Sequence, residues 1–236
     1  MDRRIELAAA LLEKRADADS LAAAGLLRSS EGKPGVAVAL LARATAVAPA
    51  RADLAWLRIQ ICREVSDCDP ELEEARLRTL DPSNGVGWLN ALARANAFRD
   101  EVAKVTMLMA IAHTERVDLY WTTLIAHLTR AVADTQKIPL SEALVDVIGL
   151  LAAQAIPAYG TVSKLCKGER LNGTDVLQNC RAVALAFERG DTDITEMIGV
   201  AIAKRAWPMD SVEWKAATEA RRAYAYRSQL WIQEFG

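Results

Sequence analysis

The chain has few of the residues that break helices and few that commonly serve in active sites. Its 236 residues include only 12 glycines, 7 prolines and 2 histidines, and aromatic side chains make up 6% of it. Alanine and leucine dominate instead, and both lose little conformational freedom in a helix. No convincing run alternates valine, isoleucine or threonine with polar residues, as a half-buried strand would require. The composition therefore favours an all-α protein.

The sequence also lacks an excess of one charge and a long apolar run. Lysine and arginine number 29 against 31 aspartates and glutamates, and the two signs are interspersed. Nucleic acids and anionic membranes are bound through a basic face, so we expect no nucleic-acid partner. The longest apolar stretch, residues 143–156, is interrupted by Asp146 and Gln154, so we expect no transmembrane segment.

Sequence motifs of catalysis are missing as well. The zinc-protease pattern H-E-x-x-H, the Walker loop, G-x-S-x-G and G-x-G-x-x-G do not occur. His113-Thr-Glu115 resembles the H-x-E of zinc deaminases, but the P-C-x-x-C of those enzymes does not follow. A spatial pairing of His113 or His127 with a cysteine stays open, because such pairs need not be close in sequence. We expect no enzyme activity, no catalytic residue, no cofactor and no metal site.

The start of the chain does not resemble a signal peptide. Met1-Asp2-Arg3-Arg4 leads into an amphipathic pattern, without a solid apolar core or a cleavage site of small residues. The protein is therefore expected to be either cytoplasmic or exported by a signal that has been trimmed away.

Four cysteines bear on that choice because they form two local pairs. Cys62 and Cys68 flank a turn between two expected helices, and Cys166 and Cys180 flank the loop after a short helix. Reduced, buried thiols are one interpretation. Metal or redox chemistry is another, although the spacing fits C-x-x-C ligand pairs poorly. We favour two disulfides, Cys62–Cys68 and Cys166–Cys180, and with them a periplasmic or secreted protein.

The sequence does contain a repeat, marked by tryptophan. Trp56, Trp88 and Trp121 are spaced by 32 and 33 residues, and each lies near the start of an apolar helical pattern. Pro49 and Pro82 lie in the turns before the first two of these patterns. A fixed period of this length is typical of stacked helix pairs. The helices expected in this region are 3–15, 19–28, 36–47, 53–63, 70–80, 87–96, 100–112 and 118–133.

Residues 17–133 resemble the tetratricopeptide repeat, a helix-turn-helix unit of 34 residues. The tryptophans match the first key position of that family, and the two prolines match its closing proline. Two further positions depart from the family pattern, a small residue and a tyrosine, where this chain has Gln60, Leu92 and Ile125, and Arg63, Ala95 and Leu128. The stretch from Cys68 to Leu89 is also similar to uncharacterised secreted helical proteins of gamma-proteobacteria, a resemblance that implies no activity.

The period is lost after about residue 135. Residues 141–156 form a very apolar expected helix, which we predict to be buried on most sides. Further helices are expected at 157–166, 175–189, 193–206 and 210–236. The predicted organisation is a helix-pair repeat array over 1–135 and a helical bundle over 136–236 packed on it. The fold class is therefore all-α, a tetratricopeptide-like α-solenoid with an irregular C-terminal helical bundle.

Candidate binding residues follow from the resemblance, because arrays of helix pairs bind partners on a concave face. It places ten positions of the tryptophan-bearing helices there: Leu57, Ile61, Glu64, Leu89, Ala93, Asn96, Thr122, Ala126, Thr129 and Arg130. Glu64, Asn96, Thr129 and Arg130 are the polar candidates for partner binding. Ordinary surface is the alternative for each.

The last expected helix is a second candidate surface. Tyr224, Trp231 and Phe235 share one of its faces, and Trp214 lies near its start. This aromatic stripe either covers the end of the array or is exposed to a partner, since binding hot spots are enriched in tryptophan, tyrosine and arginine.

The predicted function is a non-catalytic protein-binding scaffold in the cell envelope, with a protein or peptide partner. An immunity or inhibitor protein that blocks a toxic effector is one alternative, and an enzyme with an unrecognised site is another. An enzyme predicts a deep polar pocket with titratable residues, whereas a scaffold predicts a broad groove. The oligomeric state is left open.

Overall fold

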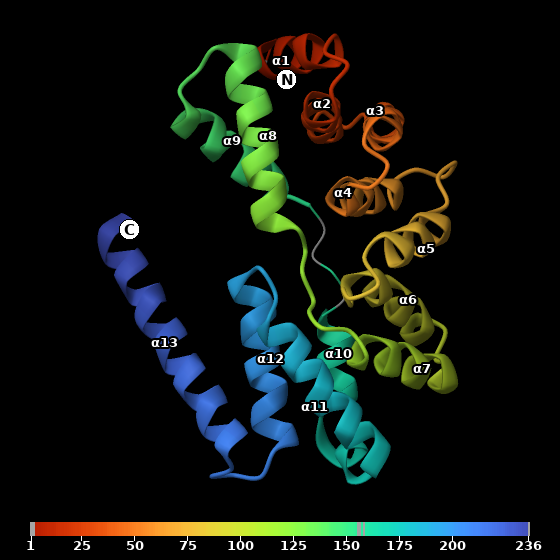
Figure 1. The fold of residues 1–236 in the computed structure, drawn as a ribbon, viewed down its shortest axis with the longest axis vertical. Helices are drawn as coiled ribbons and strands as arrows, with labels where there is room; N and C mark the ends of the chain where they lie inside the picture. The colour runs from red at the N-terminus through yellow and green to blue at the C-terminus, as the bar shows by residue number, and fades with distance from the viewer. Residues whose placement is uncertain (1–2, 155–156, 158, 236) are drawn as a thin grey trace. The chain divides into compact units, whose positions relative to one another are not determined.

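A computed structural model describes residues 3–154, 157 and 159–235 of the chain (Figure 1). Within these residues the regular structure consists of thirteen α-helices and one 3-10 helix, with no strand. One isolated β-bridge pairs Asn84 with Arg116. None of the described helices is long and apolar enough to cross a membrane. The all-α prediction is confirmed.

The helices follow one another closely along the sequence. They are α1 (Arg3–Glu13), α2 (Ala18–Ser30), α3 (Pro34–Val47), α4 (Ala52–Cys62), α5 (Pro70–Leu80), α6 (Val86–Ala97), α7 (Glu101–Ala112), α8 (Trp121–Gln136), α9 (Leu140–Ala152), α10 (Tyr159–Leu165), α11 (Thr174–Glu188), α12 (Asp193–Ala206) and α13 (Val212–Phe235). The 3-10 helix, Gly168–Asn172, lies between α10 and α11.

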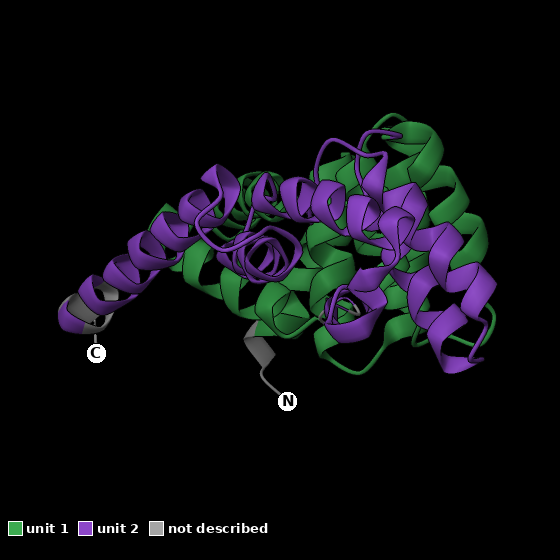
Figure 2. Ribbon diagram, turned by 90° about the horizontal axis from the view of Figure 1, so that it is seen from below, with its two compact units in different colours: residues 1–81, 120–156 green, residues 82–119, 157–236 purple. Residues whose placement is uncertain are grey.

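The chain forms two compact units, and each is assembled from two separate stretches of sequence (Figure 2). Unit 1 consists of Met1–Asp81 and Tyr120–Ile156, and unit 2 of Pro82–Leu119 and Pro157–Gly236. The predicted boundary at residue 135 therefore falls inside unit 1, in the last turn of α8, which packs against α9. The helix pairs expected to form one array are divided between the two units, since α6 and α7 belong to unit 2. A single solenoid over these pairs stays a prediction.

In unit 1, helices α1 to α5 each pack against the next one along the chain (Figure 1). α8 then packs against α1 and α2, and α9 packs against α8 and α2. The contact between α8 and α2 joins distant segments of the sequence, whereas a repeat in a solenoid contacts only its neighbours. Trp56 is buried in this unit at 5% exposure, while Trp88 in unit 2 and Trp121 at the start of α8 are half-buried.

In unit 2, the main contact is between α11 and α12, and α11 also packs on α7. Gly199 of α12 permits this approach, because a Cβ at that position would lie 2.6 Å from the carbonyl oxygen of Ala184. Phe187 is fully buried beside Tyr159, whose ring meets it edge to face at 5.8 Å between centroids. α13 packs against α12 and completes the unit.

Both predicted disulfides are present. Cys62–Cys68 closes the turn after α4 with 5.3 Å between its Cα atoms, and Cys166–Cys180 joins the end of α10 to α11 with 5.6 Å. All four cysteines are therefore bonded. The interpretation of the cysteines as reduced thiols or metal ligands does not describe this structure.

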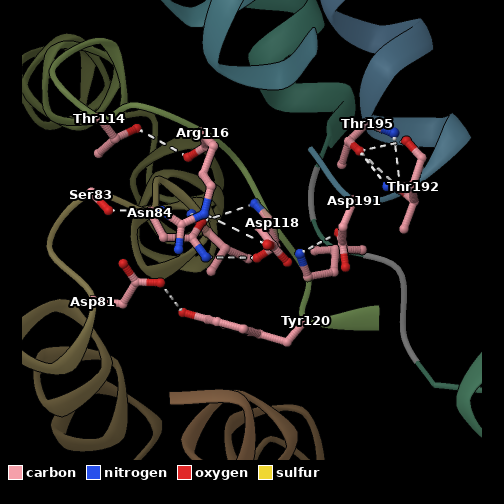
Figure 3. A network of polar contacts seen from close by, with 12 residues as sticks. Asp81, Ser83, Asn84, Thr114, Arg116, Asp118, Tyr120, Asp191, Thr192 and Thr195 are labelled. Atoms are coloured by element: carbon pink, nitrogen blue, oxygen red, sulfur yellow. Dashed lines mark hydrogen bonds and ion pairs between the residues drawn. The ribbon is translucent and has the colours of Figure 1, made fainter. Parts of the chain in front are cut away.

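A polar network fixes two of the three segments in which the chain passes from one unit to the other (Figure 3). In unit 2, the side-chain oxygen of Asn84 accepts the N–H of Asp118 at 3.0 Å, and the N–H of Leu119 donates to Asp191 at 2.8 Å. In unit 1, the hydroxyl of Tyr120 donates to Asp81 at 2.7 Å. These bonds hold residues 118–119 in a segment without regular secondary structure, and the backbone of Tyr120 is left-handed, with φ of 57°. The helix predicted from residue 118 therefore begins only at Trp121.

Candidate binding groove between α8 and α9

α9 is apolar on most of its surface, yet it is buried along only one line. Ala143, Val147 and Leu151, each four residues from the next, are buried against the unit. Leu150 is half-buried, and four other large apolar side chains form an exposed set that we call the α9 stripe: Leu140, Leu144, Val145 and Ile148. The prediction that this helix is buried on most sides is wrong, because only α8 and α2 supply it with an extensive contact.

A groove of about 380 Å³ lies beside the α9 stripe. One turn of each of two helices lines it, with Ile125, Ala126, Thr129 and Arg130 from α8 and Leu140, Ser141 and Leu144 from α9. We call this site the α8–α9 groove. Its volume is at the lower end of the range typical of sites that hold a small ligand or a side chain of a partner.

A second cavity lies on another side of α9. It measures about 320 Å³ and is lined by residues of α1, α2, α8 and α9, namely Ile5, Ala8, Leu27, Val132, Gln136, Val145, Asp146, Val147, Gly149 and Leu150. Space on two sides means that α9 makes fewer close contacts than a helix in a well-packed core. The helix that forms one wall of the groove therefore has unfilled space on two of its sides.

The polar groups of the α8–α9 groove are two hydroxyls and one guanidinium. Thr129 is only 4% exposed, and its Oγ1 has no hydrogen-bond partner among the described protein atoms. Arg130 is exposed and forms no ion pair with the described residues. No aspartate or glutamate is among the residues that line the groove. The groove is thus apolar with a single positive charge.

A ladder of charged groups fixes the position of α8 in unit 1. His127 Nδ1 lies 3.0 Å from Asp19 on α2, and the other oxygen of Asp19 lies 3.0 Å from the guanidinium of Arg51. Arg51 also donates to Asp53 on α4 at 2.7 Å. The hydrogen bond to Asp53 raises the pKa of Arg51, and Asp19 adds to the rise. Since His127 lies on α8 close to Thr129, the ladder holds the α8 wall of the groove.

The structure brings two of the four polar candidates into this site. Thr129 and Arg130 line the groove together with Ala126. Glu64 is exposed in the turn after α4 and does not line it, and Asn96 is exposed near the end of α6 in unit 2. Three other positions that the resemblance placed on a binding face are buried core residues: Leu57, Ile61 and Leu89.

The aromatic candidates of α13 lie in unit 2. Trp214 is half-buried under the ammonium of Lys204, which lies 4.7 Å from its ring centroid. Tyr224 is half-buried, and Ala217 between them is buried. Trp231 lies within the helix, but its side chain is outside the described residues. The first half of this aromatic face therefore packs within unit 2, where α13 contacts α12.

Four residues of the groove were missed by sequence reasoning: Ile125, Leu140, Ser141 and Leu144. The three on α9 were missed because the predicted domain boundary at residue 135 separated α8 from α9. An available signal was the excess of apolar residues on α9, because a single buried line needs far fewer than this helix carries.

Titratable groups with raised pKa also occur in unit 2. Burial raises the pKa of Tyr159, and the nearby charge of Asp191 adds to it. Burial and the neighbouring Glu196 raise the pKa of Glu188, against the opposing effect of Arg189. A Cβ on Gly199 would lie 2.8 Å from the Glu188 side chain, so this carboxyl sits in a tight contact between helices. In the part of the chain that is described, no three His, Cys, Asp or Glu side chains gather to hold a metal ion.

Comparison with known protein families, with curated proteins and with solved structures gives no match for this chain. Its function must therefore be inferred from the groove and its surroundings.

Proposed function

We propose that this protein is a non-catalytic protein-binding scaffold, and that the α8–α9 groove with the α9 stripe is its binding surface. The observation that carries the proposal is the exposure of Leu140, Leu144, Val145 and Ile148 on one apolar helix. A helix this rich in apolar residues normally buries most of them, and contiguous exposed apolar residues mark interaction sites. A partner that covered this stripe would remove it from water.

The chemistry of the groove supports binding over catalysis. Its lining offers apolar surface, two hydroxyls and one guanidinium. A reaction that proceeds by proton transfer needs a positioned acid or base, and an apolar groove without one favours recognition. We therefore propose a protein or peptide as the partner.

The two disulfides support an oxidising compartment for this scaffold. Disulfides persist in the periplasm and outside the cell, and they are rare in the reducing cytosol. We propose a periplasmic or secreted location.

The substitution Leu144→Asp tests the proposed surface. It places a carboxylate in the middle of the α9 stripe, at a position 37% exposed, so the fold should tolerate it. We expect affinity capture from the source cells with the oxidised, tagged protein to yield one stoichiometric partner. The variant should bind that partner at least about tenfold more weakly, since a partner that packs on the stripe would have to take the new carboxylate out of water.

Leu72→Asp is the matched control, because Leu72 is 66% exposed on α5 of the same unit, away from the groove. It should retain the partner at the affinity of the unmodified protein. Equal capture by the Leu144→Asp variant and the unmodified protein would rule out this surface as the binding site. The nature of a captured partner would also separate a scaffold from an inhibitor, which would abolish the activity of a toxic effector.

A further inference from the structure

The α8–α9 groove is short. Its lining runs from Ile125 to Arg130 on α8 and from Leu140 to Leu144 on α9. At 1.5 Å per residue these stretches are about 7.5 Å and about 6 Å long. A helix that binds in a groove uses anchors at i, i+4 and i+7, which span about 10 Å. The groove therefore matches one side chain and its immediate neighbour better than a helix of several turns.

Thr129, one of the residues that line the groove, carries an unused hydrogen-bonding group. The residue is only 4% exposed, and no described protein atom satisfies its hydroxyl. A buried hydroxyl without a partner is costly, and it recovers that cost when a ligand brings a partner to it. The occupant of the groove should therefore carry a polar atom beside its apolar part.

Arg130 indicates that the polar atom of the occupant should carry a negative charge. Its guanidinium is exposed next to Thr129 on α8 and forms no ion pair with the described residues. No carboxylate lines the groove to compete for it. A guanidinium presents a planar pair of N–H donors that matches a carboxylate. The groove is therefore complementary to a negative carboxylate held close to an apolar side chain.

We infer that the α8–α9 groove receives the C-terminal residue of a partner chain, an aliphatic side chain with its free carboxylate. A C-terminal residue carries both groups on one Cα, which fits a groove one turn long. The side chain packs between Ile125, Leu140 and Leu144, and the carboxylate accepts from Thr129 and Arg130. This inference rests on the proposed function and names the chemistry of the partner at the same site.

A matched pair of peptides tests the inference directly. Acetyl-Ala-Ala-Leu is used with a free C-terminal carboxylate and, separately, with a C-terminal amide, which removes the negative charge and one acceptor oxygen and keeps the side chain. Each peptide is titrated into the oxidised, full-length, ¹⁵N-labelled protein. We expect the acid to shift backbone amides of residues 125–130 and 140–144 in a saturable way. The amide should bind at least about tenfold more weakly.

Variants of the two polar residues separate recognition from folding. Arg130→Gln should weaken the acid by about tenfold and leave the amide peptide unchanged. Thr129→Val keeps the side-chain shape and should also weaken the acid. Equal binding of acid and amide by the unmodified protein, or shifts confined to other residues, would overturn the inference. Tighter binding of decanoate than of the peptide acid would overturn it as well, in favour of a fatty acid.

The outcomes of the two experiments are separable. If Leu144→Asp abolishes capture of the partner but acid and amide bind alike, the proposed surface stands and the C-terminal inference fails. If the acid peptide binds selectively while Leu144→Asp leaves capture intact, the groove recognises a terminal carboxylate but is not the surface that holds the captured partner, and the proposed function fails.

Discussion

At the scale of single residues, the groove depends on a hydroxyl that the folded protein leaves unsatisfied. Thr129 is buried, and its Oγ1 has no partner among the described residues. Thr45 is buried to a similar degree on α3, but its hydroxyl donates to the carbonyl of Ala42 at 3.0 Å. The two threonines are therefore buried to a similar degree, but only the hydroxyl of Thr45 forms a hydrogen bond.

This difference predicts opposite effects of the same substitution. Thr129→Val replaces an unsatisfied hydroxyl by a methyl group and should raise the free energy of unfolding by about 1 kcal/mol. Thr45→Val removes a hydrogen bond that is made and should lower it by about 1 kcal/mol. Denaturation by urea, followed by circular dichroism, measures both. A loss of stability in Thr129→Val would mean that its hydroxyl is satisfied in solution.

Sequence reasoning could select Thr129 and Arg130 but not their surroundings. Both were singled out because the spacing of the tryptophans aligns α8 with the earlier helices of the repeat. Burial of the Thr129 hydroxyl depends on how α9 packs, and no local pattern specifies that. The same spacing also pointed to Leu57, Ile61 and Leu89, which are buried because apolar residues on a helix serve the core more often than a binding face.

At the scale of elements, the sequence predicts where helices form better than where they start. The position of each helix follows from apolar spacing, with proline and glycine at the ends. The start of α8 at Trp121 is set instead by Asn84 and Asp191, distant residues that bind the backbone of 118–119. The exposed face of α9 also could not be predicted from the local sequence. The sequence shows which residues are apolar, but it does not show which other elements cover them.

The contact between α11 and α12 depends on Gly199. A Cβ there would lie 2.6 Å from the carbonyl oxygen of Ala184 and 2.7 Å from the backbone nitrogen of Glu188, neither of which is a flexible side chain. Gly199→Ala should therefore lower the free energy of unfolding by about 2 kcal/mol, since backbone must shift to accept the methyl group.

Gly149→Ala is the matched control, because Gly149 also lies within a helix but has open space where a Cβ would be, with no neighbouring atom within 4 Å. It should raise stability by up to about 1 kcal/mol, the difference between glycine and alanine in a helix. Thermal unfolding of both variants gives the comparison. Equal effects of the two substitutions would contradict the close approach of α11 and α12.

At the scale of the whole molecule, each unit carries one disulfide that closes a local loop. Cys62 and Cys68 of unit 1 are 6 residues apart, and Cys166 and Cys180 of unit 2 are 14 apart. Crosslinks restrict the unfolded chain more when the closed loop is longer. The bond in unit 2 should therefore stabilise its unit more than the bond in unit 1.

Paired cysteine-to-serine variants measure this difference. Replacing Cys166 and Cys180 together should lower the free energy of unfolding by about 3 kcal/mol, and replacing Cys62 and Cys68 by about 2 kcal/mol. Urea denaturation without reductant gives both values. The prediction fails if the shorter loop proves the more stabilising, or if adding reductant to the unmodified protein changes nothing.

The alternation of the two units along the chain sets the order in which the protein can mature during synthesis. Helices α1 to α5 emerge first, but unit 1 is incomplete until α8 and α9 have been made, after α6 and α7 of unit 2. Those two helices must in turn wait for α10 to α13. A ribosome that has reached residue 119 has therefore released neither unit in finished form. A chain that stops before α9 has been made therefore leaves both units unfinished, and unit 2 becomes complete only when α13 has been made.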